Sequence, residues 1–395
     1  MTTDTTATEG GRIAQTRKLR HLTQTGLAQA AGVSASHLSH IEQGHRQASP
    51  TVLAAIARAL SVPLADLTGQ PYLQELRRDH LDGLIQPLRE ALDIYDLGAD
   101  PDVAPRSAQA LEKHADMLCR LIRASDLRTV SAELPPAIVE TTTAAHATDE
   151  RRTWQTLASL YRSAYDVSSK LGFHDLASIA LDRSGWAAER ASDAHLAAVR
   201  QYNRALTYLR AGDYRTGMRI AEIARTTAEQ ADEGAARDAV TGQVHLATAV
   251  LAARAQDRDT VTAEIAAADR LAASTGEIPQ ELWLSFGPTN VAVHHVSVLI
   301  DQTRYAEAIT LAQEIHAPAD WPASRAAHHH AEVARAQLWM GTADAAFRRL
   351  LRARHLAPQQ TRLSPVVRET IVGVVRASRI GTDAVASYAK WVGVS

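Results

Sequence analysis

The sequence predicts an all-α protein made of a short N-terminal helical domain and a long array of repeated helices. Apolar residues recur at i, i+3, i+4 and i+7 along most of the chain, and the apolar/polar alternation of strands is nearly absent. Gly, Pro, Ser and Asp separate these helical segments. Beyond residue 150, the turn signals return at a nearly constant interval.

Composition limits the class of protein. The 395 residues are 46% hydrophobic and 22% charged, with a formal net charge of −2, which excludes a disordered or collagen-like chain. No run reaches the roughly 18 apolar residues of a membrane span, and Met1–Gly11 lacks the apolar segment of a signal peptide. We therefore expect a cytoplasmic protein with no membrane partner. The single cysteine, Cys119, excludes a disulfide framework.

Five short helices are expected within residues 12–67. Their predicted bounds are Ile13–Arg20, Gln24–Ala31, Ala35–Gln43, Thr51–Leu60 and Pro63–Leu67. Thr23 and Ser34 stand where N-cap residues belong, and Gly32 supplies the left-handed turn between the second and third helices. Pro50 precedes the fourth helix, where its missing N–H group costs nothing.

A less regular region is expected next. After a linker at Gly69–Pro71, the sequence predicts a helix over 72–97 kinked at Pro87, a loop over 98–105, a helix that ends near Ala124 and a segment broken at Pro135–Pro136. The predicted division of the chain is an N-terminal domain over 11–69, a helical connecting region over 70–149 and a repeat domain over 150–395.

The repeats are recognised by their turns. The turn markers are Gly172, Gly212, Gln256, Thr303, Gly341 and Gly381, spaced by 40, 44, 47, 38 and 40 residues. Five residues after each marker stands a mostly small side chain: Ala177, Gly217, Val261, Ala308, Ala346 and Ala386. Two helices per 38–47 residues are typical of a stacked α-solenoid. The alternative is a set of unrelated helices of similar length.

The segment Leu22–Gly44 has the pattern of a helix–turn–helix. Ala28 is small where the two helices must cross, and Leu38 and Ile41 anchor the second helix so that its polar N-terminal half can enter a major groove. Over residues 11–69 the chain closely resembles the lambda-repressor-like (XRE) DNA-binding domains, because the elements LTQ, LA, AG-V-S and I-E-x-G all fall in register.

The resemblance implies roles for individual residues and implies binding to duplex DNA as a homodimer. Gln24, Ser34 and Arg46 would contact phosphates, Ala35, Ser36 and His40 would face base edges, His37 and Ser39 would lie near the strand, and Arg17 would pair with Glu42 inside the domain. The residue types suit these roles, since serine and histidine can hydrogen-bond base edges and alanine can touch a thymine methyl.

The repeats resemble tetratricopeptide units, most clearly at Trp154–Tyr161 and Tyr208–Tyr214. An XRE domain followed by such repeats resembles the peptide-responsive RRNPP regulators, which implies a signalling peptide on the concave face of the solenoid. Positions nine and thirteen residues before the turn markers share one helix face. They give the candidate effector-binding residues Asn203, Gln243, Asn290, His294, His328 and Glu332. The alternative is a solvated polar face.

Other chemistry finds no support in the sequence. Phosphate-binding, dinucleotide-binding and nucleophile-elbow motifs are absent, and the histidine clusters lack metal-ligand spacing. We therefore expect no enzyme activity, no cofactor and no metal. The favoured hypothesis is a transcriptional regulator whose repeats sense a peptide or small-molecule effector. The alternative is an adaptor whose repeats bind a protein partner while the helix–turn–helix tethers it to DNA.

Overall fold

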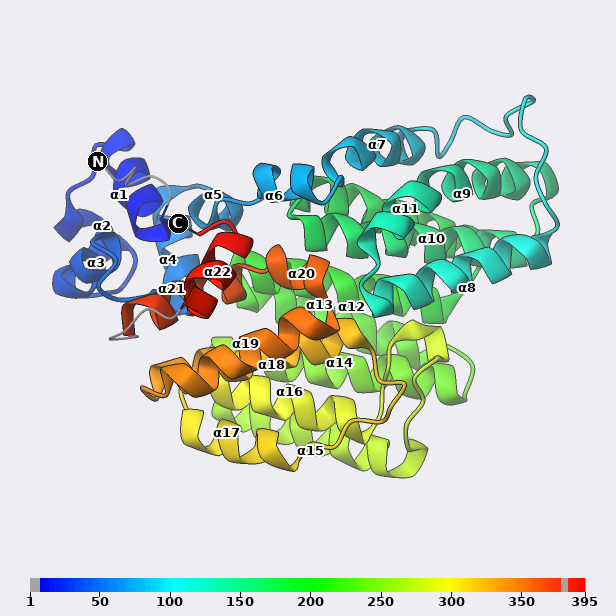
Figure 1. Ribbon diagram of the computed structural model, residues 1–395. Helices are drawn as coiled ribbons and strands as arrows, with labels where there is room; N and C mark the ends of the chain where they lie inside the picture. Colours follow the sequence, from blue (N-terminus) through cyan, green and yellow to red (C-terminus); the bar gives the residue numbers. More distant parts are fainter. Residues whose placement is uncertain (1–7, 378–382, 395) are drawn as a thin grey trace.

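The computed structural model describes residues 8–377 and 383–394, and their regular structure is helical (Figure 1). Extended pairing in this part of the chain is limited to an isolated bridge between Ile278 and Phe286. The predicted all-α class is therefore confirmed. Among the described residues, no helix combines the length and apolar character that crossing a membrane requires.

Five short helices form the N-terminal domain, and side-chain caps define where most of them begin. They are α1 (Glu9–Leu19), α2 (Gln24–Ala30), α3 (Ala35–Glu42), α4 (Pro50–Leu60) and α5 (Leu64–Thr68). The hydroxyl oxygens of Thr8, Thr23, Ser34 and Ser49 accept hydrogen bonds from first-turn N–H groups of α1 to α4. Because Thr8 caps α1, that helix starts earlier than predicted.

One apolar core holds these helices together. It is formed by Ile13, Leu27, Ala28, Ala31, Leu38, Ile41, Ala48, Leu53, Ile56, Ala57, Leu60 and Leu67. Burying each large aliphatic side chain stabilises the fold by roughly 1.5–3 kcal/mol. Between α2 and α3, Gly32 has a φ of 67°, the left-handed conformation predicted for this turn. Local signals and core packing therefore specify the same geometry.

The segment after the N-terminal domain is not the single kinked helix predicted for residues 72–97. It forms α6 (Leu73–Arg78), a 3-10 turn η2 (Asp82–Leu84) and α7 (Ile85–Asp93). The chain breaks at His80, where φ is 56°. Pro87 lies in the first turn of α7, where its missing N–H group needs no partner. The prediction therefore placed the break at the wrong residue.

The predicted break at Pro135–Pro136 is also wrong. After α8 (Ala108–Ala124), α9 (Leu127–Thr148) continues through both prolines. Leu134 and Ile138 on either side of the pair are fully buried in a core shared with the following helices. Packing on both sides therefore maintains the helix where proline removes backbone hydrogen bonds.

Consecutive helix pairs follow, as expected of a solenoid. They are α10 (Arg151–Leu171) with α11 (His174–Arg190), α12 (Ala194–Ala211) with α13 (Tyr214–Glu229), α14 (Ala235–Arg254) with α15 (Arg258–Thr275), α16 (Pro288–Asp301) with α17 (Tyr305–Glu314), and α18 (Ala323–Trp339) with α19 (Ala343–Leu356). A 3-10 turn, η3 (Glu281–Trp283), precedes α16. The markers Gly172, Gly212, Gln256, Thr303 and Gly341 occupy the turns within these pairs, and all have positive φ. The marker Gly381 lies outside the described residues.

The small residues after the turns are buried in the first five pairs. They are Ala177, Gly217, Val261, Ala308 and Ala346. The chain ends in α20 (Pro358–Arg362), α21 (Pro365–Ala377) and α22 (Asp383–Trp391). In α22 the expected Ala386 is exposed and its neighbour Val385 is buried, so the register of the last unit differs by one residue.

The N-terminal domain lies at one end of the repeats, close to the C-terminal helices α21 and α22 (Figure 1). The amide of Gln47 donates a hydrogen bond to the backbone oxygen of Glu369 in α21. Arg58 in α4 donates to the backbone oxygen of Gly212, the turn residue between α12 and α13. The domain therefore contacts two repeats that lie far apart in the sequence.

Candidate DNA-binding surface

The N-terminal half of α3 is presented to solvent, and its opposite face is buried. Leu38 and Ile41 are 0% and 2% exposed and pack in the N-terminal core. Ala35, Ser36 and His40, the predicted base-facing residues, are all exposed. This arrangement leaves a small side chain and two hydrogen-bonding side chains on the exposed face of the helix, which is suited to insertion into a major groove.

The hydroxyls of Ser34, the N-cap of α3, and of Ser39 within α3 also serve the helix itself. Ser34 Oγ accepts from the backbone N–H of His37 at 3.1 Å, and Ser39 Oγ accepts from Gln43 Nε2 at 3.2 Å. Burial lowers the pKa of His37, and the neighbouring charge of Arg46 lowers it further. The His37 ring is therefore neutral at pH 7 and can both donate and accept a hydrogen bond. Because the Ser34 and Ser39 hydroxyl oxygens act as acceptors within the protein, their O–H groups remain able to donate to another molecule.

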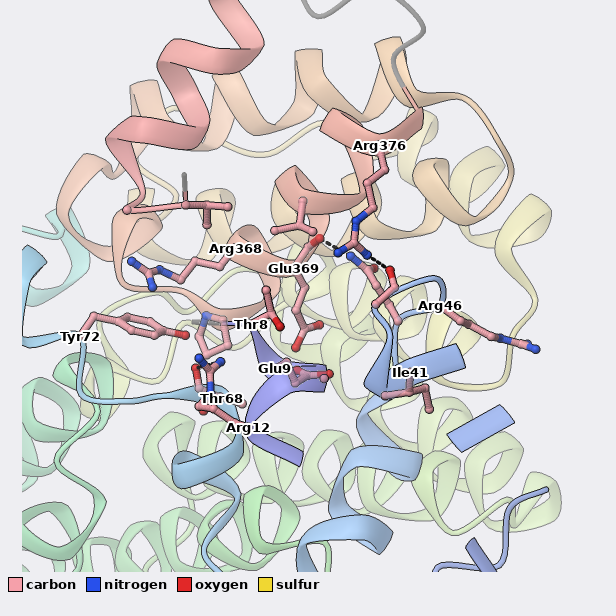
Figure 2. A pocket seen from close by; sticks show the side chains of 17 residues that line it. Thr8, Glu9, Arg12, Ile41, Arg46, Thr68, Tyr72, Arg368, Glu369 and Arg376 are labelled. Atoms are coloured by element: carbon pink, nitrogen blue, oxygen red, sulfur yellow. Dashed lines mark hydrogen bonds between the residues drawn. The ribbon is translucent and has the colours of Figure 1, made fainter. Parts of the chain in front are cut away.

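The predicted phosphate contacts differ in their surroundings. Arg46 is exposed just after α3, and Figure 2 shows its side chain extending away from Glu9 and Glu369. Gln24 is half-buried, and its Nε2 donates to Glu42 Oε2 at 2.8 Å. Part of the Gln24 amide is thus engaged inside the domain, whereas the Arg46 guanidinium is open to solvent.

Arg17 and Glu42 form a bidentate ion pair between α1 and α3. Arg17 Nε lies 2.6 Å from Glu42 Oε1, and Arg17 NH2 donates to Glu42 Oε2 at 2.9 Å. Their side chains are only 11% and 4% exposed. The hydrogen bond to Glu42 is the main cause that raises the pKa of Arg17. The pair connects α1 to the C-terminal end of α3.

A cavity of about 140 Å³ lies between the N-terminal domain and the C-terminal helices (Figure 2). Arg376 of α21 donates across it to the backbone oxygen of Gly44, just after α3. Glu9 and Glu369 face one another from α1 and α21 in Figure 2. Burial, together with the neighbouring carboxyl of Glu369, raises the pKa of Glu9 well above its usual range.

Three predicted effector-binding residues are engaged inside the repeats. Asn203, Gln243 and Asn290 are 6%, 0% and 0% exposed. Gln243 Nε2 donates to the backbone oxygen of Leu284 at 2.7 Å, and Asn290 Oδ1 accepts from Arg325 NH1 at 2.9 Å. The Asn290 Nδ2 group is buried and has no hydrogen-bond partner among residues 8–377 and 383–394. These three side chains are buried and do not form an open ladder.

The other three differ in exposure. Burial lowers the pKa of His294 to about 4, and its Nδ1 lies 2.8 Å from the backbone oxygen of Asn290. Glu332 is buried and pairs with Arg335. Among the six, only His328 is exposed. None of the six lines the cavity beside Glu9 or the larger cavity between the N-terminal domain and the repeats.

Sequence reasoning missed this larger cavity, which has a volume of about 430 Å³. Its lining comes from α4 and α5 of the N-terminal domain and from α10, α11, α12, α14, α18 and α21 of the rest of the chain. The two sides are far apart in the sequence, since α5 ends at Thr68 and α10 begins at Arg151, so no local spacing pattern could have identified the residues as neighbours.

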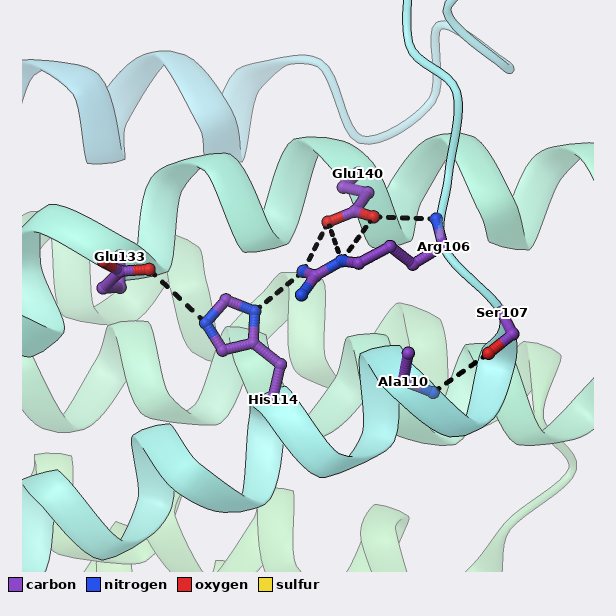
Figure 3. A network of polar contacts seen from close by, with 6 residues as sticks. All are labelled: Arg106, Ser107, Ala110, His114, Glu133 and Glu140. Atoms are coloured by element: carbon purple, nitrogen blue, oxygen red, sulfur yellow. Dashed lines mark hydrogen bonds and ion pairs between the residues drawn. The ribbon is translucent and has the colours of Figure 1, made fainter.

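A separate polar network holds the loop before α8 against α9 (Figure 3). Glu140 accepts from the guanidinium of Arg106 at 2.6 Å and from its backbone N–H at 2.8 Å. This hydrogen bonding lowers the pKa of Glu140 and raises that of Arg106. His114 lies between Arg106 and Glu133. The network is half exposed and organises the loop.

The described residues contain no group of three or more His, Cys, Asp or Glu side chains arranged to hold a metal ion.

In comparisons with known proteins, residues 13–67 match the helix-turn-helix family. No curated protein matches the chain. The chain is similar to the crystal structure of Bacillus thuringiensis PlcR in complex with the peptide PapR7 and DNA, at 12% identity, over 88% of this chain and 93% of that chain, with a TM-score of 0.34. The similarity to the helix-turn-helix family thus covers α1 to α5, the N-terminal domain.

Proposed function

We propose that this chain is a sequence-specific DNA-binding transcription regulator. The observation that carries the proposal is the exposed N-terminal half of α3 within a helix–turn–helix domain, supported from behind by Leu38 and Ile41. A helix held in this way can reach base edges while the rest of the domain contacts the backbone.

Within this proposal, Ala35, Ser36 and His40 read base edges, and Arg46 contacts a phosphate. None of the three reading residues forms the bidentate pair that an arginine or asparagine makes with a base. Discrimination at each position is therefore below the roughly 1–3 kcal/mol of such a pair. Gln24, Ser34, His37 and Ser39 contribute contacts to the DNA backbone, with Gln24 oriented by its bond to Glu42.

A homodimer completes the proposal, since one domain with few phosphate contacts binds weakly. Domains of this kind recognise half-sites about 34 Å apart. The repeats bind an effector, a peptide or a small molecule, that changes affinity for the operator. Such an effector acts only if its affinity differs between two arrangements of the domain and the repeats.

The test is selection of binding sites by the purified full chain from a random duplex library, followed by measurement of affinity against salt concentration. We expect enrichment of a two-fold symmetric site bound by two chains. His40→Ala should reduce discrimination at one base pair per half-site by about tenfold or less. Arg46→Ala should weaken binding to all sequences and reduce the salt slope by about 0.9 for each phosphate that is no longer neutralised.

Arg215→Ala is the matched control, because Arg215 is an exposed arginine of α13 outside the N-terminal domain. It should leave both affinity and salt slope unchanged. Failure to enrich any duplex at low salt would overturn the proposal. A stable protein partner together with absent specific DNA binding would instead support the adaptor hypothesis.

A further inference from the structure

The 430 Å³ cavity has the size of a small-molecule site and is bounded by both parts of the chain. Pockets for organic ligands typically measure about 300–1,000 Å³. Because one wall belongs to the helix–turn–helix domain and the other to the repeats, a molecule in this cavity contacts both at once. Such a ligand has higher affinity for the docked arrangement than for any other.

Much of the lining is apolar. Pro50, Leu53 and Ala54 of α4 and Leu64 of α5 line the cavity from the N-terminal domain, and Leu209 of α12 lines it from the repeats. Leu53 and Ala54 are only 4% and 2% exposed. An occupant therefore needs an apolar body, since a polar one would lose its hydration against these side chains without replacement.

The repeats add three arginines to the lining, and one of them has no ion-pair partner among the described residues. Glu369 of α21 also lines the cavity, and burial raises the pKa of its carboxyl. Arg254 lies 2.7 Å from Asp301, and Arg335 pairs with Glu332, so two of the three lining arginines are compensated. The third, Arg210, takes part in no ion pair among the described residues, and its NH2 donates to the hydroxyl of Tyr165 at 3.0 Å.

The lining also contains polar atoms without partners. His174 Nδ1 and Arg335 Nε are buried and make no hydrogen bond within the described chain. Burial and the charge of Arg210 lower the pKa of His174 to about 4, so its ring is neutral at pH 7. Unpaired buried polar groups are costly, and a ligand that supplies a donor and an acceptor removes that cost.

We propose that this cavity binds an amphipathic organic anion, whose charged group pairs with Arg210 and whose apolar body packs on α4 and α5. The inference rests on the proposed function, because it identifies the class of effector and where it acts. It differs from a site on the predicted polar stripe, since none of the stripe residues lines this cavity. Occupancy stabilises the contact between the DNA-binding domain and the repeats, and thereby changes the position of α3.

The test uses the full chain and two fluorescent probes of similar shape, the anion anilinonaphthalene sulfonate and its uncharged analogue phenylnaphthylamine. The wild type should bind one sulfonate per chain with a blue-shifted emission. Arg210→Gln, which keeps a polar group beside Tyr165, should weaken sulfonate binding by about tenfold or more, as expected for loss of a charge-assisted hydrogen bond. Binding of the uncharged probe should not change, and Arg210→Lys should restore part of the sulfonate affinity.

Two tryptophan variants locate the site. Thr207→Trp places a large ring in the cavity lining and should abolish binding of both probes, whereas Thr226→Trp adds the same ring at an exposed position of α13 and should not. Circular dichroism checks that each variant folds. Equal sulfonate affinity in wild type and Arg210→Gln, or retained binding in a folded Thr207→Trp, would overturn the inference.

DNA binding by the same preparations separates this inference from the proposed function. If Arg210→Gln binds the selected duplex normally and Arg210 proves irrelevant to the sulfonate, only the cavity inference fails. If the sulfonate binds as expected and no duplex is bound, the proposed function fails and the anion site stands.

Discussion

Glu42 shows how one side chain of α3 serves the fold instead of the DNA surface. Its two carboxylate oxygens accept from Arg17, and Oε2 also accepts from Gln24. The side chain is 4% exposed, so its charge depends on these donors in place of water. Removing one partner leaves the other as a buried, unpaired charge, whereas replacing both with apolar groups avoids that cost.

At this scale we predict that Arg17→Met lowers the unfolding free energy of the N-terminal domain by about 3–5 kcal/mol. The double variant Arg17→Met/Glu42→Leu should recover much of that loss. Lys18→Ala, at the next and exposed position, is the control and should change stability by less than about 0.5 kcal/mol. Urea unfolding followed by circular dichroism measures all three; a single variant as stable as the double would contradict the prediction.

At the scale of elements, the turns within the helix pairs show what a marker residue does. Gly212 and Gly341 both adopt left-handed φ, 72° and 77°, which a side chain disfavours. They differ in what surrounds them. A Cβ at Gly341 would meet open space, whereas a Cβ at Gly212 would overlap Ala54 of α4 in the N-terminal domain. Gly341 therefore serves only its turn, whereas Gly212 also allows the N-terminal domain to dock against the repeats.

We therefore predict that Gly341→Ala costs about 1 kcal/mol of stability, from backbone strain alone. Gly212→Ala should cost at least about 2 kcal/mol, because it also separates α4 from the turn and disturbs the bond between Arg58 and Gly212. Thermal unfolding measures both, and hydrogen exchange of α4 amides should increase only in Gly212→Ala. Equal effects of the two substitutions would show that the domain contact contributes nothing.

At the scale of the whole molecule, the contact between α1 and α21 brings two carboxyls together. Burial is the main cause that raises the pKa of both Glu9 and Glu369, and the two acids influence each other. The positive charge of Arg12 lowers the pKa of both acids, and that of Arg335 lowers the pKa of Glu369. The negative charge of Glu332 raises the pKa of Glu369 further. An acid whose pKa is raised by docking favours the docked state when protonated, so docking is strongest at low pH and weakens as pH rises through the raised pKa.

Glu369→Gln should therefore strengthen docking at neutral pH and flatten its pH dependence, because the neutral amide needs no proton. Glu229→Gln, at an exposed position of α13, should behave like the wild type. Thermal unfolding of the full chain between about pH 5 and pH 8 checks this prediction. If the wild type gains stability relative to Glu369→Gln as pH rises, the assigned direction is wrong.

Local patterns accounted for much of the fold and part of the candidate site. The cap at Ser34, the turn at Gly32 and the spacing of Leu38 and Ile41 determine a helix with one buried and one exposed face, and each of these signals acts within a few residues. The turn residues of the repeats could also be predicted from the sequence, because a left-handed turn depends only on neighbouring residues.

Local patterns failed where packing outweighs them. Two consecutive prolines predicted a broken helix, but α9 continues through them because its flanking residues are buried on both sides. The polar stripe through Asn203, Gln243 and Asn290 predicted an open face, but the sequence does not reveal which face of a repeat helix its neighbours cover.

By itself, then, the sequence determined that the chain is helical, that it begins with a helix–turn–helix domain and that paired helices follow. Only the tertiary structure decided where that domain lies against the repeats, and it thereby created the cavity beside Arg210 and the facing carboxyls of Glu9 and Glu369. The physical reason is distance along the chain. Helix signals arise between residues three or four apart, whereas these sites exist only where segments separated by more than a hundred residues pack together.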